Sequence, residues 1–435
     1  MGSMGKEMEK LRSRASEADR LEEENKQTTD RIVEIEGLYR DEQLLRKKYW
    51  NMMEDMKGKI RVYARCRPMA RYEIEKGCDR AVRFLDETTL EVDSGRGPRQ
   101  FTYDTVFSEE HGQGQVFEDT KNLVQSAMDG YNVCVVAYGQ TGSGKTWTMT
   151  GIPGDAEKAG LTPRAIAEIY GLADKGKGVL EVRVSCYFVE LYLDQLRDLF
   201  FAMDNPRGKD AAPKLEIKMD AKKMVVIKNA VMKEASSAEE LMQLFTEGNA
   251  QRKVGGTKMN AESSRSHSVF GVIVEVHNLK TKKTSTGKLS LVDLAGSERA
   301  DKTGATADRL KEAQSINKSL SAMGDVISAL STGEKFVPYR NNKLTQVMQD
   351  SLGGNAKTLM FVNISPADYN QDETLTSLMY ASRVKLITND ANKNQDSEEV
   401  ARLKNIIRGL RAGEAVAGDS DNGDGDGDAT AAAGA

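Results

Sequence analysis

A glycine-rich run that ends in Lys-Thr is the stretch of this sequence best suited to chemistry. It matches the phosphate-loop pattern G-x-x-x-x-G-K-[ST] at every fixed position. The glycines let successive backbone N–H groups turn toward a phosphate, and a helix starting after them adds the positive end of its dipole. Lys145 would reach the β- and γ-phosphates, and the Thr146 hydroxyl would ligate Mg²⁺. The sequence therefore predicts a nucleoside triphosphate site formed by Gly139, Gln140, Thr141, Gly142, Ser143, Gly144, Lys145 and Thr146.

Two polar stretches downstream supply groups that hydrolysis needs beyond the phosphate loop. Residues 260–267 read N-A-E-S-S-R-S-H and offer hydroxyls and a guanidinium, and residues 293–299 read D-L-A-G-S-E-R after an apolar run. The Asp293 carboxylate could hold the water shell of Mg²⁺, and the Gly296 N–H could touch a γ-phosphate. Loops of this kind order when the γ-phosphate is present and relax when it leaves. Each stretch alone fits a polar surface turn, but the three together indicate triphosphate hydrolysis.

These stretches need a sheet to bring them together. Apolar and alternating runs predict strands at 60–68, 81–84, 89–92, 101–106, 132–138, 180–188, 215–219, 224–227, 268–276, 288–293 and 357–364. Helical patterns predict helices at 237–253, 306–330, 341–352 and 372–387, and a turn leading into a short helix at 190–199. We therefore expect one α/β domain with a central, mostly parallel but mixed sheet, helices on both faces and nucleotide at the C-terminal edge of the strands.

Composition and charge narrow the classes of protein that remain. The 435 residues include 29% charged side chains, as in globular proteins, and four cysteines without a C-x-x-C pair, so we expect neither a metal cluster nor a disulfide framework. No apolar run reaches the ~20 residues of a membrane span. The total charge of −4 divides into −2 on residues 1–57, +2 on 58–390 and −4 on 391–435. That balance argues against a nucleic-acid binder and favours an acidic partner for the central region.

Residues 1–57 have the composition of a long helix. Nine of fourteen a and d positions of a heptad register starting at Leu11 are apolar, and Pro is absent. This permits a parallel coiled-coil homodimer, and an equally good interpretation is a single extended helix lying on the domain. We expect four regions: a neck helix or coiled coil (1–57), the α/β domain (58–390), a linker and amphipathic helix (391–412), and an acidic disordered tail (413–435).

Taken together, the motifs resemble those of the kinesin motor domain. The resemblance rests on G-Q-T-G-S-G-K-T at 139–146, N-x-x-S-S-R-S-H at 260–267 and D-L-A-G-S-E at 293–298. Weaker matches extend it over about residues 59–388. It implies the P-loop NTPase fold of that motor, preceded by a neck helix, and an ATP hydrolase that works with Mg²⁺ and alternates between ATP and ADP. Myosins and small GTPases lack the S-S-R-S-H stretch, and the absence of an N-K-x-D guanine motif favours ATP.

The resemblance assigns a nucleobase site. Arg65, Arg67 and Pro68 would lie against the adenine, with Tyr138 and Trp147 beside it. Kinesins often have His where this chain has Trp147, so base stacking is expected to differ here.

It also assigns the metal and hydrolysis residues. Ser264 would join Thr146 and a water-linked Asp293 around Mg²⁺. Asn260 and Ser263 would hold the γ-phosphate and the attacking water.

The switch between nucleotide states is likewise implied by the resemblance. Gly296 would sense the γ-phosphate, and a salt bridge between Arg265 and Glu298 would close the loops and align the attacking water. No conventional general base is needed, because phosphoryl transfer depends mainly on positioning and charge neutralisation.

Microtubules are the partner that the resemblance implies, through tubulin contacts at Asn317, Lys318, Arg340 and Lys343. The expected location is therefore the cytoplasm and its microtubule cytoskeleton, with the spindle as one site. The helix before the motor, running directly into the first strand, resembles the neck of kinesin-14 motors, which move toward microtubule minus ends.

After the motor comes a basic amphipathic helix. Val400, Leu403, Ile407 and Leu410 share one face, which could dock in a calmodulin-type groove. This helix with its acidic tail resembles the regulatory end of calmodulin-binding kinesin-14 proteins of plants and green algae, although it lacks an aromatic anchor. A helix docked back on its own motor is the open alternative.

Two functional hypotheses remain. The first is a microtubule-stimulated ATPase that drives minus-end-directed movement. The second is a non-motile, nucleotide-gated microtubule tether or bundler, whose turnover is too slow for movement. Intact Lys145, Arg265 and Glu298 favour the first.

Overall fold

The computed structural model describes residues 58–396, apart from 96, 153, 208–209, 253–264 and 299–306, together with parts of the N-terminal segment, namely 8, 14–15, 17–35, 38–39 and 42. The predictions for Asn260, Ser263 and Ser264 lie outside the described residues. So do those for the amphipathic helix, with Val400, Leu403, Ile407 and Leu410, and for the tail.

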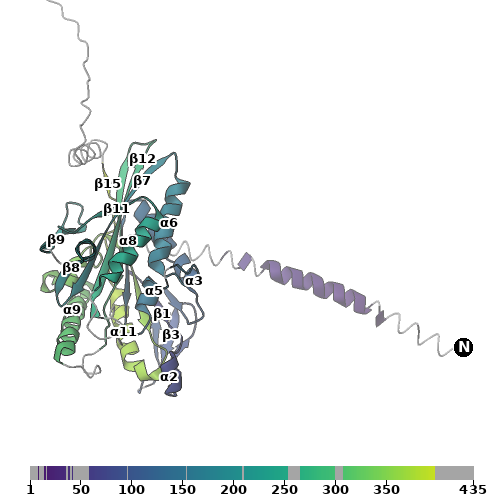
Figure 1. The fold of residues 1–435 in the computed structure, drawn as a ribbon. Helices are drawn as coiled ribbons and strands as arrows, with labels where there is room; N and C mark the ends of the chain where they lie inside the picture. Colours follow the sequence, from purple (N-terminus) through teal and green to yellow (C-terminus); the bar gives the residue numbers. More distant parts are fainter. Residues whose placement is uncertain are drawn as a thin grey trace, which may run out of the picture.

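A mixed sheet forms the centre of the molecule (Figure 1). Its strand order is β11-β7-β12-β13-β6-β14-β1-β5. The strands from β13 to β5 in that order are parallel to one another, whereas the pairs β13–β12, β12–β7 and β7–β11 are antiparallel. The strands are β1 (Arg61–Cys66), β5 (Thr105–Phe107), β6 (Asn132–Tyr138), β7 (Leu180–Tyr192), β11 (Lys233–Ala235), β12 (His267–Asn278), β13 (Thr284–Asp293) and β14 (Ala356–Ile364). The expected α/β fold with a mixed sheet is confirmed, and its parallel half is the half that carries the phosphate loop.

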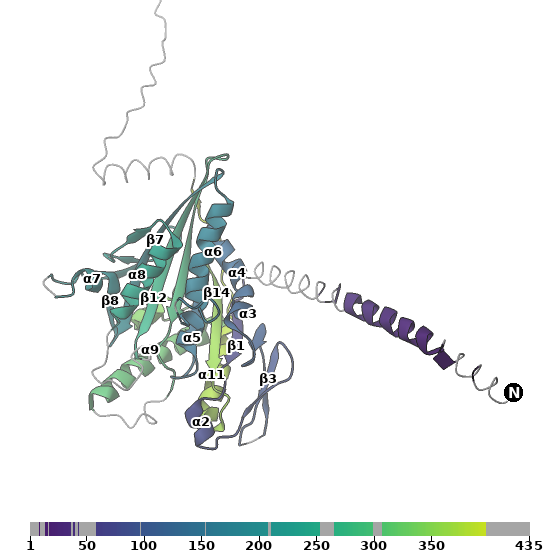
Figure 2. The same cartoon turned by 45° about the vertical axis from the view of Figure 1, so that its right-hand side comes forward.

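Helices cover both faces of this sheet, which gives two apolar cores (Figures 1 and 2). One face packs against α9 (Ala307–Thr332), α10 (Lys343–Val347) and α11 (Gln371–Val384). The other face packs against α3 (Gln113–Glu118), α4 (Lys121–Met128), α6 (Leu161–Lys175), α7 (Leu199–Asp204) and α8 (Ala238–Ala250). Successive side chains of β6 alternate between the two cores, as the strand period requires. The central strand is therefore buried on both faces.

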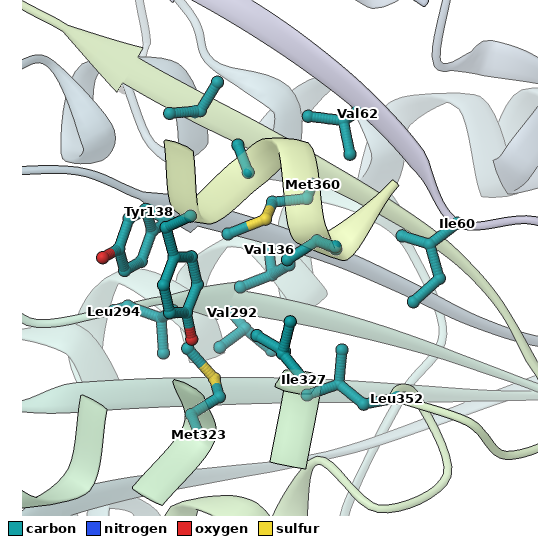
Figure 3. Close-up of a cluster of buried hydrophobic side chains, with 14 of the residues drawn as sticks. Ile60, Val62, Val136, Tyr138, Val292, Leu294, Met323, Ile327, Leu352 and Met360 are labelled. Atoms are coloured by element: carbon teal, nitrogen blue, oxygen red, sulfur yellow. The ribbon is translucent and has the colours of Figure 1, made fainter. Parts of the chain in front are cut away.

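Figure 3 shows how the first core continues up to the end of β6. Tyr138, the last residue of the strand, lies with Leu294 and Met323 in this cluster. Its ring stacks on Tyr380 of α11 at a centroid distance of 4.4 Å. The strand that leads into the phosphate loop is thereby packed against both α9 and α11.

Small elements complete the domain. They are α2 (Arg71–Glu75), α5 (Lys145–Met149), the sheet of β2 (Val82–Phe84), β3 (Thr89–Val92) and β4 (Arg99–Thr102), the hairpin of β9 (Glu216–Met219) and β10 (Val225–Lys228), and the short helices η3 (Tyr339–Asn341) and η4 (Asp368–Asn370). The predicted hairpin at 215–227 is confirmed.

Some local predictions were wrong. The chain does not turn into a helix at 190: β7 runs to Tyr192 and folds back as β8 (Gln195–Asp198). The connecting residues Leu193 and Asp194 both have positive φ, as a tight hairpin of this hand requires, but no glycine marks them. Helix α6 was also not predicted, although its buried positions 161, 165, 166 and 169 have helical spacing.

The two ends of the chain differ in how they relate to the domain. Residues 17–35 are helical and exposed on every side, so none of these side chains packs on the domain, and the alternative of a helix lying on it is wrong for this part (Figure 1). At the other end, the sheet continues beyond the expected boundary at 390, since β15 (Gln395–Asp396) pairs with β13. Among the described residues, no helix combines the length and apolar character needed to cross a bilayer.

A buried ion pair ties the hairpin of β9 and β10 to the sheet. Lys288 Nζ lies 2.5 Å from Asp350 Oδ2, and both side chains are almost fully buried. The same oxygen accepts the backbone N–H of Val225, and Nζ donates to the carbonyl of that residue. Burial alone would lower the pKa of Lys288, but the carboxylate of Asp350 outweighs it and raises this pKa.

Removing one partner of this pair should destabilise the domain strongly. Asp350→Ala strands a buried ammonium, so we expect the free energy of unfolding to fall by about 3–5 kcal/mol in urea denaturation. The control is Glu75→Ala, which breaks the exposed pair with Arg71 and should cost less than about 0.5 kcal/mol. Similar losses of unfolding free energy in both variants would contradict a strong contribution of the buried Lys288–Asp350 pair to stability.

Candidate functional site

The phosphate loop connects β6 to α5 at the C-terminal edge of the parallel strands. Two of its glycines are required by geometry. Gly139 has φ 146°, and a Cβ there would lie 2.2 Å from the carbonyl oxygen of Asn363. Gly144 caps α5 with φ 100°. The predicted order of strand, glycine loop and helix is confirmed.

Lys145 lies at the floor of this loop and is buried. Its Nζ donates to the carbonyl oxygens of Gly139 and Gln140, each at 2.9 Å. Burial lowers the pKa of Lys145, and the carboxylates of Asp293 and Glu298 counteract this. A cation whose hydrogen bonds go to neutral carbonyls gains from a hydrogen-bonded anionic oxygen, which a polyphosphate would supply.

Thr146 and Asp293 meet beside Lys145. The Thr146 hydroxyl lies 3.0 Å from Asp293 Oδ2. Asp293 Oδ1 and the Ser143 hydroxyl are buried without a hydrogen-bond partner among the described residues. Hydroxyl and carboxylate oxygens are the donors that Mg²⁺ prefers, so the residues present fit Mg²⁺ with a triphosphate. Thr146 would bind the ion directly and Asp293 through water, and the ion would neutralise charge on the phosphates.

Arg252 was missed by the sequence analysis. It lies just beyond α8, and its side chain is buried against Asp293, with Nη1 3.5 Å from Oδ2. Its other Nη donates to the carbonyl and hydroxyl oxygens of Ser266. Arg252 thus ties the metal-side carboxylate to the start of β12. No local pattern marks it, because its partner is 41 residues away.

A cleft of about 360 Å³ opens beside the loop and is the candidate nucleobase site. Its lining includes the residues expected around the adenine, namely Arg65, Arg67, Pro68 and Trp147. Trp147 is 42% exposed and offers a ring face for stacking. Tyr138 does not line the cleft, so its prediction was wrong: as the last residue of β6 it points into the opposite core and stacks on Tyr380.

The two arginines at this cleft have structural partners. Arg65 donates to Gln113 at 2.8 Å and to Thr148 at 3.0 Å, and burial lowers its pKa to about 10. Arg67 donates to the carbonyl of Gly142 at 2.7 Å and forms a double hydrogen bond with Glu73. Arg67 therefore supports the phosphate loop from outside. Gln113, which also donates to the carbonyl of Trp147 at 2.7 Å, was not foreseen.

The expected salt bridge between Arg265 and Glu298 is absent from this structure. Arg265 pairs with Glu312 of α9 at 2.8 Å, and Glu298 accepts hydrogen bonds from the backbone N–H and the hydroxyl of Thr141. The second carboxylate oxygen of Glu312 accepts the Tyr192 hydroxyl. The prediction overlooked Glu312 because it lies on a helix with no motif residue at that position.

His267 joins three elements around Gly296. Its Nδ1 accepts the N–H of Ala295 at 3.1 Å, so its Nε2 carries the proton and donates to the Ser319 hydroxyl at 2.8 Å. That hydroxyl donates in turn to the carbonyl of Ile316. A directed chain of hydrogen bonds therefore runs from the loop that carries the buried Gly296 to the middle of α9.

The predicted tubulin contacts lie on α9 and in the segment that follows it. Lys318 and Arg340 are exposed, and Asn317 and Lys343 are half-buried. The sequence analysis did not name Phe336, whose side chain is 77% exposed four residues before Arg340. Helix α9 thus carries two of the candidate tubulin contacts, Asn317 and Lys318, together with the partners of His267 and Arg265.

Protonation of His267 should destabilise the fold in acid. Burial first, then Arg252 and Lys145, lower its pKa from 6.5 to about 3. The unfolded chain therefore binds a proton that the folded chain rejects, and stability falls by about 1.4 kcal/mol per pH unit below 6.5.

The measurement is urea denaturation at several pH values between 7 and 5. His267→Gln should lose this part of the slope, whereas His277→Asn, at the far end of the same strand, should keep it. An unchanged slope in the first variant would contradict a buried neutral imidazole.

Comparison with known proteins places this architecture in a family. The model of the kinesin motor domain matches residues 65–387, which is most of the chain. A solved structure of a fast kinesin superposes with a TM-score of 0.71 at 39% identity, over 78% of this chain and 94% of the other.

Relatives of known sequence agree. The chain is 50% identical to kinesin-like protein KIN-14E of Arabidopsis thaliana and 48% identical to kinesin-like protein KIN-14I of Oryza sativa subsp. japonica, each over 92% of this chain. It spans 32% of the length of each. The phosphate loop, the Thr146–Asp293 pair and these matches show that the chain belongs to the kinesin motor domain family, with relatives of the kinesin-14 group, and that its nucleotide is ATP or ADP with Mg²⁺.

Proposed function

We propose that this chain is a microtubule-stimulated ATPase that produces minus-end-directed movement. The observation that carries the proposal is that Lys145 and Thr146, at the start of α5, lie beside Asp293 at one edge of the sheet. Asp293 ends β13, which continues into the loop of Gly296 and Glu298. The cation and the Mg²⁺ ligands stabilise charge on the transferred phosphoryl group.

Coupling to tubulin would run through α9. Lys318 and Arg340 are exposed cations on and beyond this helix, suited to the acidic surface of tubulin. The hydrogen-bond chain through His267 links the same helix to the phosphate-sensing loop. Asn260, Ser263 and Ser264, outside the described residues, would complete the sites of the γ-phosphate and the metal. In cells this activity belongs on cytoplasmic microtubules and, during division, on the spindle.

Loss of the phosphate-loop lysine should abolish turnover. Lys145→Ala removes the cation at the β- and γ-phosphates, so microtubule-stimulated kcat should fall by at least about 100-fold in a phosphate-release assay. The control is Lys76→Ala, which removes an exposed lysine at the C-terminal end of α2 and should leave turnover unchanged. Unchanged turnover in Lys145→Ala would overturn the site assignment.

The direction of movement is tested by a gliding assay on polarity-marked microtubules. With this chain fixed by its N-terminus, minus-end-directed movement makes microtubules glide with their plus ends leading. Steady ATP-dependent binding without directed gliding would instead establish the tether or bundler. The kinesin-14 relatives and the helical segment before the first strand favour movement.

The N-terminal helix is proposed to form a parallel homodimer. Its heptad positions Leu21, Ile32 and Ile35 are more than half exposed in the single chain, so a second copy would bury them. This dimer would place two heads on one neck.

Calcium regulation is proposed for the amphipathic helix expected at 396–411. Its apolar face suits a calmodulin-type groove, which we expect to lower microtubule-stimulated turnover when calcium is bound. Leu403→Asp places a charge on that face and should abolish the effect, while Asn405→Asp, on the opposite face, should preserve it. Turnover measured with and without calcium–calmodulin decides this, and equal rates for the unmodified chain would refute regulation.

A further inference from the structure

Two ionic groups of the hydrolysis machinery have partners here other than each other. Arg265 Nη1 pairs with Glu312 Oε2 at 2.8 Å, and both side chains are largely shielded from solvent, with 22% and 12% exposed. Glu298 packs against the phosphate loop, where it accepts hydrogen bonds from the Thr141 N–H at 2.7 Å and from the Thr141 hydroxyl at 2.5 Å. The carboxylates of Glu298 and Glu312 therefore both have hydrogen-bond donors, and the Arg265 guanidinium has a carboxylate partner.

The position of Glu298 is that of an anion bound to the phosphate loop. Backbone N–H groups of such loops serve to receive phosphate oxygens, and a carboxylate makes the same kind of charge-assisted hydrogen bond. A Cβ on Gly296 would lie 2.2 Å from Glu298 and 2.3 Å from Thr141, so the loop with Gly296 lies directly against these groups. A terminal phosphate that takes the Thr141 N–H must displace Glu298.

The other half of the arrangement is built to hold Arg265. Glu312 Oε1 accepts the Tyr192 hydroxyl at 2.5 Å, which fixes the carboxylate while Oε2 faces the guanidinium. Burial and this carboxylate raise the pKa of Tyr192 to about 12, so the phenol remains a donor. Tyr192 is the last residue of β7, so a strand of the sheet and a helix together form the cradle for Arg265.

We propose that Glu298 is an internal stand-in for the terminal phosphate and that Glu312 with Tyr192 is the resting cradle of Arg265. When the phosphate of ATP takes the Thr141 N–H, both pairs exchange: Glu298 leaves the loop and takes Arg265 from Glu312. The phosphate replaces Glu298 on the loop and Glu298 replaces Glu312 beside Arg265, so Glu312 keeps the Tyr192 hydroxyl but loses its cation, and this loss is the cost that opposes the exchange. This rests on the proposed function, since it supplies the resting state from which the Arg265–Glu298 bridge forms.

The exchange gives tubulin a means of acting on the site. Glu312 and Lys318 are six residues apart on one helix, or about 9 Å along its axis. A partner that draws α9 away from the sheet through Lys318 also draws Glu312 from Arg265. Once Glu312 has moved away from Arg265, Arg265 would pair more readily with Glu298. Because this pair aligns the attacking water, turnover would rise.

The test measures affinity for ADP with beryllium fluoride, a mimic of the terminal phosphate, against affinity for ADP alone. Glu312→Gln keeps the shape of the cradle and removes its charge, so ADP–beryllium fluoride should bind about tenfold more tightly, since the competing state is depopulated. Affinity for ADP alone should change less than twofold. Tyr192→Phe should act in the same direction with a smaller effect, and Glu312→Asp should restore part of the original affinity.

Three results would overturn the proposal. They are equal shifts for both ligands, an unchanged affinity for ADP–beryllium fluoride in Glu312→Gln, and the same tightening in Asp325→Asn, the control that removes an exposed charge from the same helix. In a Glu298→Gln background the effect of Glu312→Gln should vanish, because the exchange has lost its second partner. If the unmodified chain hydrolyses Mg·ATP but Glu312→Gln binds ADP–beryllium fluoride with the same affinity as the unmodified chain, this inference alone fails. If the unmodified chain neither binds nor hydrolyses ATP, the proposed function fails with it.

Discussion

The parallel register of β6 and β13 is the constraint on which the rest of the site depends. It pairs Asp293 with Ala137, and beyond the strands the N–H of Ser297 donates to the carbonyl of Gly139. The end of one strand is thereby fixed beside the start of the phosphate loop, with Thr146 within hydrogen-bond distance of Asp293. A slip of one residue would turn Asp293 toward the opposite face of the sheet and separate it from Thr146, the other candidate metal ligand.

The site holds charged side chains away from water, where an unpaired charge costs free energy. Lys145, Asp293 and Arg252 are all buried, and each depends on the others or on backbone carbonyls for compensation. Such an arrangement is sensitive to one added anion, because electrostatic interactions are stronger away from water. For the same reason Arg265, which is largely shielded from solvent, depends on Glu312 as its partner.

Helix α9 is where this chemistry meets the surface. It contributes Leu320, Met323 and Ile327 to one core, and Ser319 and Glu312 to the contacts with His267 and Arg265. Its exposed side carries Lys318. Because packed helices shift as rigid bodies rather than deform, a force on the exposed side reaches the buried contacts. Figure 3 shows Met323 and Ile327 in the same cluster as Tyr138 and Val136, which belong to the strand that carries the loop.

Residue types and spacing by themselves determined the phosphate loop, the choice of Thr146 and Asp293 as candidate Mg²⁺ ligands, and most strands of the sheet. These features depend on local chemistry: glycines permit the loop, and alternating apolar residues mark a strand. The hairpin at Leu193 and Asp194 escaped prediction because its positive φ angles fall on residues that rarely adopt them.

Only the tertiary structure decided which polar groups are partners. In the folded chain Tyr138 points away from the base cleft into the core. Arg252 is buried against Asp293. Arg265 pairs with Glu312, 47 residues away along the chain. The physical reason is that an ion pair depends on distance and desolvation in space. Sequence fixes neither quantity for residues on different elements.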